Sequence, residues 1–198
     1  MHDLYSEGIR IANEIKALDG PNVAEPCHSR LYTHGHRVER SLTLLHGFTR
    51  CPQQLDRVGR ELYERGWNVF IPRYPRHGYS DRFSRSITEL RADHLIALAN
   101  RAALVGSGLG EHLTVAGVEL GAILAGLLAA TRDDVYRAVL QAPRVRAIWR
   151  PNLYVWRAYL SCLATERRFV EAERASPPKA HSVVVTRDSL SPQLIEES

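Results

Sequence analysis

Along most of the chain, apolar and polar residues follow two patterns that alternate in regular order. Short apolar runs have the length and composition of strands buried on both faces; they are 41–47, 67–73, 113–118 and 136–143. Segments in which apolar residues recur every three to four positions, the period of an amphipathic helix, are 53–66, 86–106 and 120–130. Strands that alternate with helices predict an α/β fold with a mostly parallel sheet and helices on both faces.

The two ends of the chain are less regular. Residues 6–20 carry apolar side chains at helical spacing and end at a Gly-Pro pair that predicts a helix stop. Residues 30–39 indicate two short extended pieces around a turn at His34 and Gly35. A last strand is expected at 182–186, at an exposed edge of the sheet. Because such an edge carries unpaired backbone groups, it predicts a homodimer that pairs along it.

Length and charge exclude several classes of protein. The chain has 198 residues, of which 44% are hydrophobic and 24% charged, so it predicts a single domain, 1–198, with a sizeable core. Its net charge is +4, but acidic residues are interspersed with the 26 lysines and arginines through most of the chain. A continuous basic groove for nucleic acid is therefore not indicated. The charged start of the chain has no apolar segment, which predicts a cytoplasmic protein without a signal peptide.

The cysteines and histidines do not indicate a metal site or a cofactor. Cys27, Cys51 and Cys162 are odd in number and lack a C-x-x-C spacing, which argues against a disulfide framework or a zinc ribbon and favours a reducing compartment. We expect Cys51 and Cys162 to be buried as small apolar residues. The His-Gly-His sequence at 34–36 is assigned to an ordinary turn rather than to metal ligands.

Three motifs fall directly after predicted strands, at the edge where ligand sites form in parallel sheets. They are Leu-Leu-His-Gly-Phe-Thr at 44–49, Arg-His-Gly-Tyr-Ser at 76–80 and Val-Ala-Gly-Val-Glu-Leu-Gly at 115–121. In this order and spacing they resemble the α/β-hydrolase family, nearest to its carboxylesterase and monoacylglycerol-lipase-like members. The resemblance covers 41–143, continues more weakly through the last strand, and implies carboxylic ester hydrolysis.

The third motif corresponds to the nucleophile elbow of that family. Gly117 and Gly121 flank the elbow, where a strained strand-to-helix turn crowds the backbone. The position between them is Glu119, whereas the family usually has serine there. The resemblance further implies an oxyanion hole built from the backbone N–H groups of Phe48 and Leu120, and such a hole does not depend on the serine.

The partners that the resemblance implies for the elbow residue are incomplete. Asp188, after the last strand, is the only match for the acid, and no histidine follows it, so the chain looks truncated at its C-terminal end relative to the family. His181 precedes its strand, which we take to place it at the opposite edge of the sheet. His46 and His77 follow strands and could approach Glu119, although we expect His46 chiefly to hold the oxyanion loop and His77 to stabilise its own loop.

These residues leave three functional hypotheses. The chain is a relative of carboxylic ester hydrolases with impaired or absent serine-hydrolase activity, or an inactive relative that binds an acyl ligand or a protein partner, which fits the residues best. The third is a hydrolase that uses Glu119 as nucleophile or general base.

Segment 144–178 is expected to form a small helical cap with aromatic and basic side chains. Packing of these side chains on the sheet is favoured over contact with an acyl chain or a membrane surface.

Overall fold

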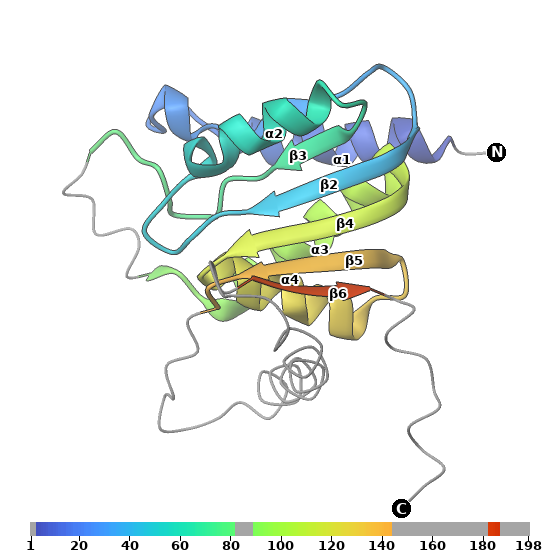
Figure 1. Cartoon of the computed structure of the whole chain (residues 1–198). Helices are drawn as coiled ribbons and strands as arrows, with labels where there is room; N and C mark the ends of the chain where they lie inside the picture. The colour runs from blue at the N-terminus through green and yellow to red at the C-terminus, as the bar shows by residue number, and fades with distance from the viewer. Residues whose placement is uncertain (1–2, 82–88, 144–181, 187–198) are drawn as a thin grey trace, which may run out of the picture.

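The computed structural model describes residues 3–81, 89–143 and 182–186 (Figure 1). Within them, six strands form one sheet in the order β1-β3-β2-β4-β5-β6. The strands are β1 Arg30–Tyr32, β2 Val38–Leu45, β3 Asn68–Ile71, β4 Gly110–Val118, β5 Val135–Gln141 and β6 Ser182–Thr186. The four central strands run parallel, and β1 and β6 pair antiparallel at the two edges.

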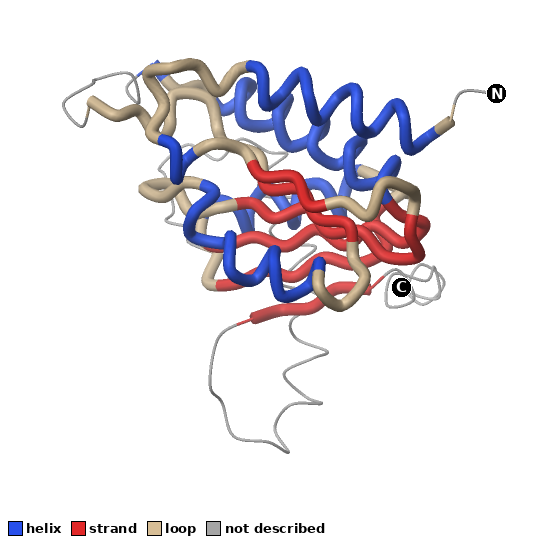
Figure 2. The backbone as a smooth tube through the Cα atoms, turned by 90° about the horizontal axis from the view of Figure 1, so that it is seen from above, coloured by secondary structure: helices blue, strands red, loops and turns tan. Residues whose placement is uncertain are grey.

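Helices cover both faces of this sheet. In the described part of the chain they are α1 Leu4–Ala17, α2 Asp56–Tyr63, α3 Ala92–Leu109 and α4 Leu120–Thr131, with short 3-10 turns η1 Glu25–Cys27 and η2 Pro52–Leu55. Helices α1, α3 and α4 lie on one face and α2 on the other (Figures 1 and 2). The predicted α/β fold, with a mostly parallel sheet between helices, is confirmed.

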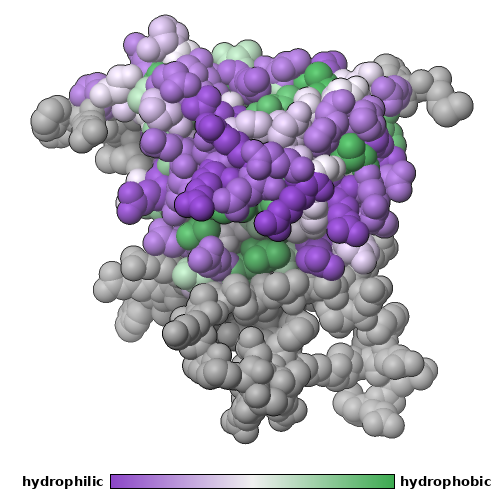
Figure 3. All heavy atoms as spheres, turned by 45° about the horizontal axis from the view of Figure 1, so that its top comes forward, coloured by the Kyte–Doolittle hydropathy of each residue, from purple (hydrophilic) through white to green (hydrophobic). Residues whose placement is uncertain are grey.

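The central strands β2, β3 and β4 are largely buried on both faces, as their apolar runs predict. Successive residues of a strand point to opposite faces, so neighbouring side chains of β2 enter different cores. Leu45 belongs to the larger core beneath α1, α3 and α4, whereas Leu44 belongs to the smaller core beneath α2. The outer surface of the described atoms in Figure 3 is largely polar, with apolar residues in small separate groups.

Helix α3 corrects one predicted boundary. The sequence predicts a helix at 86–106, whereas α3 begins at Ala92 and continues past Gly106 to Leu109. Gly106 therefore does not end the helix. A Cβ on Gly106 would lie only 2.7 Å from Thr43 Oγ1, so the glycine allows the helix to pack closely against β2.

Strand β6 occupies the predicted edge but runs antiparallel to β5. Ser182 pairs with Gln141, the last residue of β5, and Thr186 pairs with Arg137 near its start. The beginning of β6 therefore lies at the carboxyl edge of the central strands and its end at their amino edge. Pairing of two copies along β6 stays a prediction.

Two further expectations concern the cap and membranes. The cap predicted at 144–178 lies outside the described residues. Among the helices that the structure describes, none combines the length and the apolar character needed to cross a membrane.

Candidate functional site

The turn between β4 and α4 holds Glu119 in a backbone conformation that L-residues rarely adopt. Its φ is 53° and its ψ is −108°, between a strand that ends at Val118 and a helix that begins at Leu120. The Glu119 N–H donates to the carbonyl of Gln141 at 3.0 Å and so fixes the corner to β5. A sharp strand-to-helix turn of this kind is the nucleophile elbow of α/β-hydrolase-like folds. The structure thus places Glu119 at the elbow position.

Both glycines that flank the elbow are required by close backbone packing. A Cβ on Gly117 would overlap the carbonyl group of Gly121, and a Cβ on Gly121 would overlap the carbonyl oxygen of Leu45. Backbone atoms cannot rotate aside as the end of a flexible side chain can. The corner is therefore held by the shape of the main chain, whatever side chain stands at position 119.

The Glu119 carboxylate lies against the loop that follows β2. A Cβ built on Gly47 would lie 3.0 Å from Glu119 Oε2 and 3.5 Å from Gln54 Oε1. Gln54 also holds this loop, because its Oε1 accepts the Gly47 N–H at 2.9 Å. The absence of a side chain at position 47 leaves room for the carboxylate, which carries its negative charge into the expected oxyanion loop.

The two expected oxyanion donors belong to the residues next to this contact. Leu120 is the first residue of α4, where N–H groups have no acceptor within the helix. Phe48 follows Gly47, its ring is 44% exposed, and its carbonyl accepts a hydrogen bond from His77. The carboxylate that lies beside this loop is that of Glu119.

His46 is completely buried and both of its ring nitrogens bind the backbone. Nε2 accepts the Tyr74 N–H at 3.3 Å, so Nδ1 carries the proton and donates to the Gly47 carbonyl at 2.9 Å. Burial lowers the pKa of His46 from 6.5 to about 3, which keeps the ring neutral. This arrangement ties the loop after β2 to the loop after β3 and supports a positioning role rather than that of a base.

Both ring nitrogens of His77 lie beside backbone carbonyl oxygens, to one of which a neutral ring donates a hydrogen bond. Nε2 lies 2.7 Å from the carbonyl oxygen of Phe48, and Nδ1 lies 2.9 Å from that of Pro75. The ring therefore joins the same two loops from the outer side. Neither His46 nor His77 directs a free ring nitrogen toward Glu119.

The predicted acid, Asp188, lies outside the described residues. Its placement near the elbow assumed that β6 runs parallel to β5. Thr186, the last described residue before it, instead pairs with Arg137 at the amino edge of β5. Asp188 as a partner of Glu119 stays a prediction.

The same reversal changes the argument about His181, which also lies outside the described residues. The expectation that His181 lies at the opposite edge of the sheet requires a parallel last strand, whereas β6 runs antiparallel to β5. Ser182, directly after it, pairs with Gln141, whose carbonyl accepts the Glu119 N–H. The strand thus starts at the elbow edge of the sheet.

Sequence analysis missed the buried ion pair that anchors the second loop. The side chains of Arg73, which follows β3, and Asp19, which follows α1, are each 5% exposed, and Arg73 Nε donates to Asp19 Oδ1 at 2.6 Å. The other guanidinium nitrogens donate to the carbonyl groups of Leu18, Tyr74 and His77. An arginine directly after a buried strand is the only signal for this anchor in the sequence.

The expectation of unpaired cysteines is wrong for two of the three. Cys27 and Cys51 form a disulfide, with their Cα atoms 5.1 Å apart, and Cys162 lies outside the described residues. Their separation of 24 positions carried no sign of this closeness. They meet because the segment around Cys27 folds back over the loops at the carboxyl edge.

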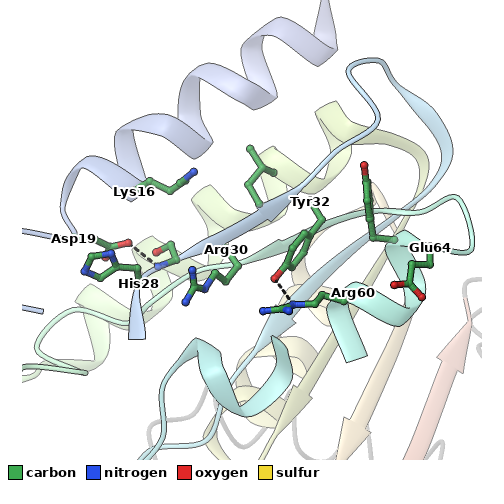
Figure 4. A pocket seen from close by; sticks show the side chains of 10 residues that line it. Lys16, Asp19, His28, Arg30, Tyr32, Arg60 and Glu64 are labelled. Carbon is green, nitrogen blue, oxygen red and sulfur yellow. Dashed lines mark hydrogen bonds between the residues drawn. The ribbon is translucent and has the colours of Figure 1, made fainter. Parts of the chain in front are cut away.

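A groove of about 720 Å³ follows the outer edge of β1 (Figure 4). Its two arginines are paired with carboxylates, Arg60 with Asp56 and Arg30 with Glu25. Strands β3 and β2 separate β1 from β4 in the sheet. No group of three or more potential metal ligands occurs among the described residues. The elbow, rather than this groove, is therefore the candidate site.

Comparison with known proteins gives partial structural similarities. No family model and no curated protein matches the sequence. One similar solved structure is a metagenome-derived lipolytic enzyme from a study of LipS and LipT, with TM-score 0.48, 21% identity, and coverage of 54% of this chain and 41% of that chain. A Pyrococcus furiosus esterase has TM-score 0.47, 16% identity, and coverage of 76% and 51%. MenH from S. aureus has TM-score 0.41, 18% identity, and coverage of 55% and 39%. The chain spans about half the length of these structures or less.

Proposed function

We propose that this protein binds a neutral acyl compound, such as a fatty-acyl ester, at the carboxyl edge of its sheet and does not hydrolyse it by a serine mechanism. The observation that carries the proposal is the position of Glu119. Its backbone has the elbow conformation, and its carboxylate lies against Gly47 in the expected oxyanion loop.

The absence of serine hydrolysis follows from what nucleophilic catalysis needs. A hydroxyl nucleophile must stand beside a base that accepts its proton. Position 119 supplies a carboxylate instead, and the ring nitrogens of His46 and His77 are bound to backbone groups. The surroundings of the elbow are thus suited to holding a ligand, because the loops are fixed, but they lack a base in the described residues.

The charge of Glu119 favours a neutral ligand over an anionic one. A free fatty acid would bring a second carboxylate to the same loop, and two like charges in a partly desolvated place repel strongly. A neutral ester avoids this repulsion, and a hydroxyl of a glyceride would donate a hydrogen bond to the carboxylate. Phe48, with its exposed ring beside the elbow, offers apolar surface to an acyl chain.

A second candidate function is hydrolysis with Glu119 itself as nucleophile or general base. The strained backbone at Glu119 favours it, because such strain is common where a side chain is aimed at a substrate. An ester intermediate on the carboxylate would still need an activated water for its release.

Titration calorimetry with a medium-chain monoacylglycerol and with the matching free fatty acid tests both functions. Near neutral pH the protein should bind the ester at least about ten-fold more tightly than the acid, and Glu119→Gln should reduce this preference to less than about three-fold. Glu64→Gln, in the groove along β1, is the matched control and should leave the preference unchanged.

Turnover is followed in parallel with a nitrophenyl ester. The binding function predicts none. Turnover that Glu119→Gln abolishes would establish the second candidate instead. Equal binding of ester and acid, or binding of neither, contradicts the proposed ligand class.

A further inference from the structure

The Cys27–Cys51 disulfide joins two segments that reach the candidate site from different parts of the chain. Cys27 ends η1, before β1, and Cys51 directly precedes η2, at the end of the expected oxyanion loop. The bond therefore connects the region before the sheet with the loop that contacts Glu119.

On the Cys27 side, the segment 22–28 is held to the second loop by the backbone. The Ala24 N–H donates to the Gly78 carbonyl at 2.8 Å, and the Ser80 N–H donates to the Asn22 carbonyl at 2.8 Å. A Cβ on Gly78 would lie 2.5 Å from Cys27 Cβ, so the disulfide packs directly on this loop. Segment 22–28 and loop 77–80 thus form one unit.

On the Cys51 side, the loop 46–51 has few other attachments to that unit. The Phe48 carbonyl accepts from His77, and the Gly47 N–H donates to Gln54, which belongs to η2. The disulfide closes this set of contacts into a ring that runs from Cys27 through Gly78, His77 and Phe48 to Cys51. Cutting the disulfide leaves the His77 contact with the Phe48 carbonyl as the described link from loop 46–51 to loop 77–80, while His46 holds the start of the loop to Tyr74.

The disulfide is open to small solutes. Cys27 and Cys51 are half-buried and both line a cavity of about 660 Å³, together with Arg50, Gln53 and Gln54. A small solute in this cavity can therefore approach the disulfide, and disulfide exchange requires such access. A disulfide buried in a core lacks such access.

We propose that the Cys27–Cys51 disulfide is a thiol-exchange site at which a small dithiol releases the oxyanion loop from segment 22–28. One thiolate of the dithiol attacks a disulfide sulfur, forms a mixed disulfide and displaces the other cysteine as a thiolate. The second thiol of the reagent then attacks the reagent sulfur of the mixed disulfide and displaces the remaining cysteine. The products are two cysteine thiols and one reagent molecule with an internal disulfide. Two electrons and two protons pass from the dithiol to the cysteines.

Release of the disulfide changes the loop beside Glu119 while the elbow stays in place. The glycines at 117 and 121 hold the elbow without any help from the disulfide. The loop 46–51, by contrast, gains freedom to move away from the carboxylate. The oxidised protein therefore holds a closed oxyanion loop, and the reduced protein holds an adjustable one.

Hydrogen exchange with and without dithiothreitol tests the proposal in the full chain carrying Cys162→Ser, which removes the third thiol. Alkylation and mass measurement should show that Cys27 and Cys51 are reduced without denaturant. The backbone amides of 47–51 should then exchange at least about ten-fold faster, while those of β4 keep their protection. Trypsin should cut after Arg50 at least about ten-fold faster in the reduced protein.

The matched control is Cys27→Ser with Cys51→Ser, which should behave as the reduced protein and not respond to the dithiol. Free Cys27 and Cys51 thiols in protein that is purified without a reductant would overturn the proposal. It would also be overturned by a disulfide that resists reduction without denaturant, by unchanged exchange at 47–51, or by a loss of protection that extends to β4. None of these results depends on the ligand or on catalysis.

Discussion

The elbow and the loops that surround it are maintained in different ways. At the elbow, main-chain atoms pack so closely that Gly117 and Gly121 are required, and the corner persists with a glutamate in place of a nucleophilic hydroxyl. Around it, the loops after β2 and β3 are held by side chains, chiefly His46, His77 and Arg73. Backbone packing thus fixes the shape of this corner independently of the side chain at position 119.

The surrounding loops also show where histidines are used. Each imidazole near the elbow has its nitrogens on backbone groups of two loops, which makes it a link between them. A histidine held in this way supports the shape of the site but has no free nitrogen for proton transfer. The shape of the site and its capacity for proton transfer thus depend on different contacts. Four measurements of stability distinguish the contacts that hold the shape.

The largest effect is expected at the buried anchor of the second loop. Arg73→Met leaves the Asp19 carboxylate buried without its partner, which should lower the free energy of unfolding by about 4 kcal/mol. Urea denaturation measures this change. Arg57→Met, at a side chain that is 91% exposed, is the matched control and should leave stability nearly unchanged. Similar losses in both variants would show that the anchor contributes little.

A somewhat smaller loss is expected at the elbow itself. Gly121→Ala pushes a Cβ into the Leu45 carbonyl, and the shift of β2 or α4 that relieves it should cost about 3 kcal/mol in the free energy of unfolding. Gly20→Ala is the control, because a Cβ there meets no atom within 4 Å. If Gly121→Ala is tolerated as well as Gly20→Ala, the corner is not fixed by the main chain.

Removal of the disulfide should affect the loops less than either of these substitutions. Cys27→Ser with Cys51→Ser opens a loop of 24 positions, for which the chain-entropy account gives an upper value of about 3.5 kcal/mol. Residual structure in the unfolded chain lowers the expected loss to about 2–3 kcal/mol. Thermal denaturation of this variant, with and without dithiothreitol, measures the loss. Addition of the dithiol should lower the melting temperature of the parent protein only. A variant as stable as the oxidised parent would contradict the account of the ring of contacts.

Acid should weaken the protein through His46. Its pKa is about 3 in the folded protein and near 6.5 when unfolded, so below pH 6.5 the unfolded chain takes up a proton that the native state refuses. The stability from burial of the neutral ring is complete above pH 6.5 and declines as pH falls, by at most about 1.4 kcal/mol per pH unit. Urea denaturation at pH 7 to 4.5 should show this slope, and His46→Gln should flatten it. His36→Gln, at an exposed position, should keep it.

Much of the fold follows from the sequence because burial imposes a period on it. The four central strands and the helices between them lie where the apolar runs and amphipathic segments predict. The end of α3 was misplaced because Gly106 has the same sequence signature whether it ends a helix or packs against Thr43. The direction of β6 depends on how the chain returns to the sheet, which the alternation of residues within a strand does not encode.

The candidate site was only partly predictable, for a related reason. The turn at Glu119 has a local signature, a strand and a helix separated by flanking glycines, and Glu119 lies between β4 and α4 with a positive φ. The Cys27–Cys51 pair and the Arg73–Asp19 pair join residues far apart in the chain. No local pattern reports such contacts, since they depend on where whole segments meet in three dimensions.

The central claim is that this strand-to-helix turn keeps the shape of a nucleophile's position, while the described residues place no base beside it. Replacing Glu119 by serine and measuring the hydrolysis of a short-chain nitrophenyl ester tests it most directly. The account predicts a folded variant whose rate stays at that of the buffer alone. Rapid turnover by Glu119→Ser, lost again when a histidine is substituted, would contradict it by revealing a base already in position.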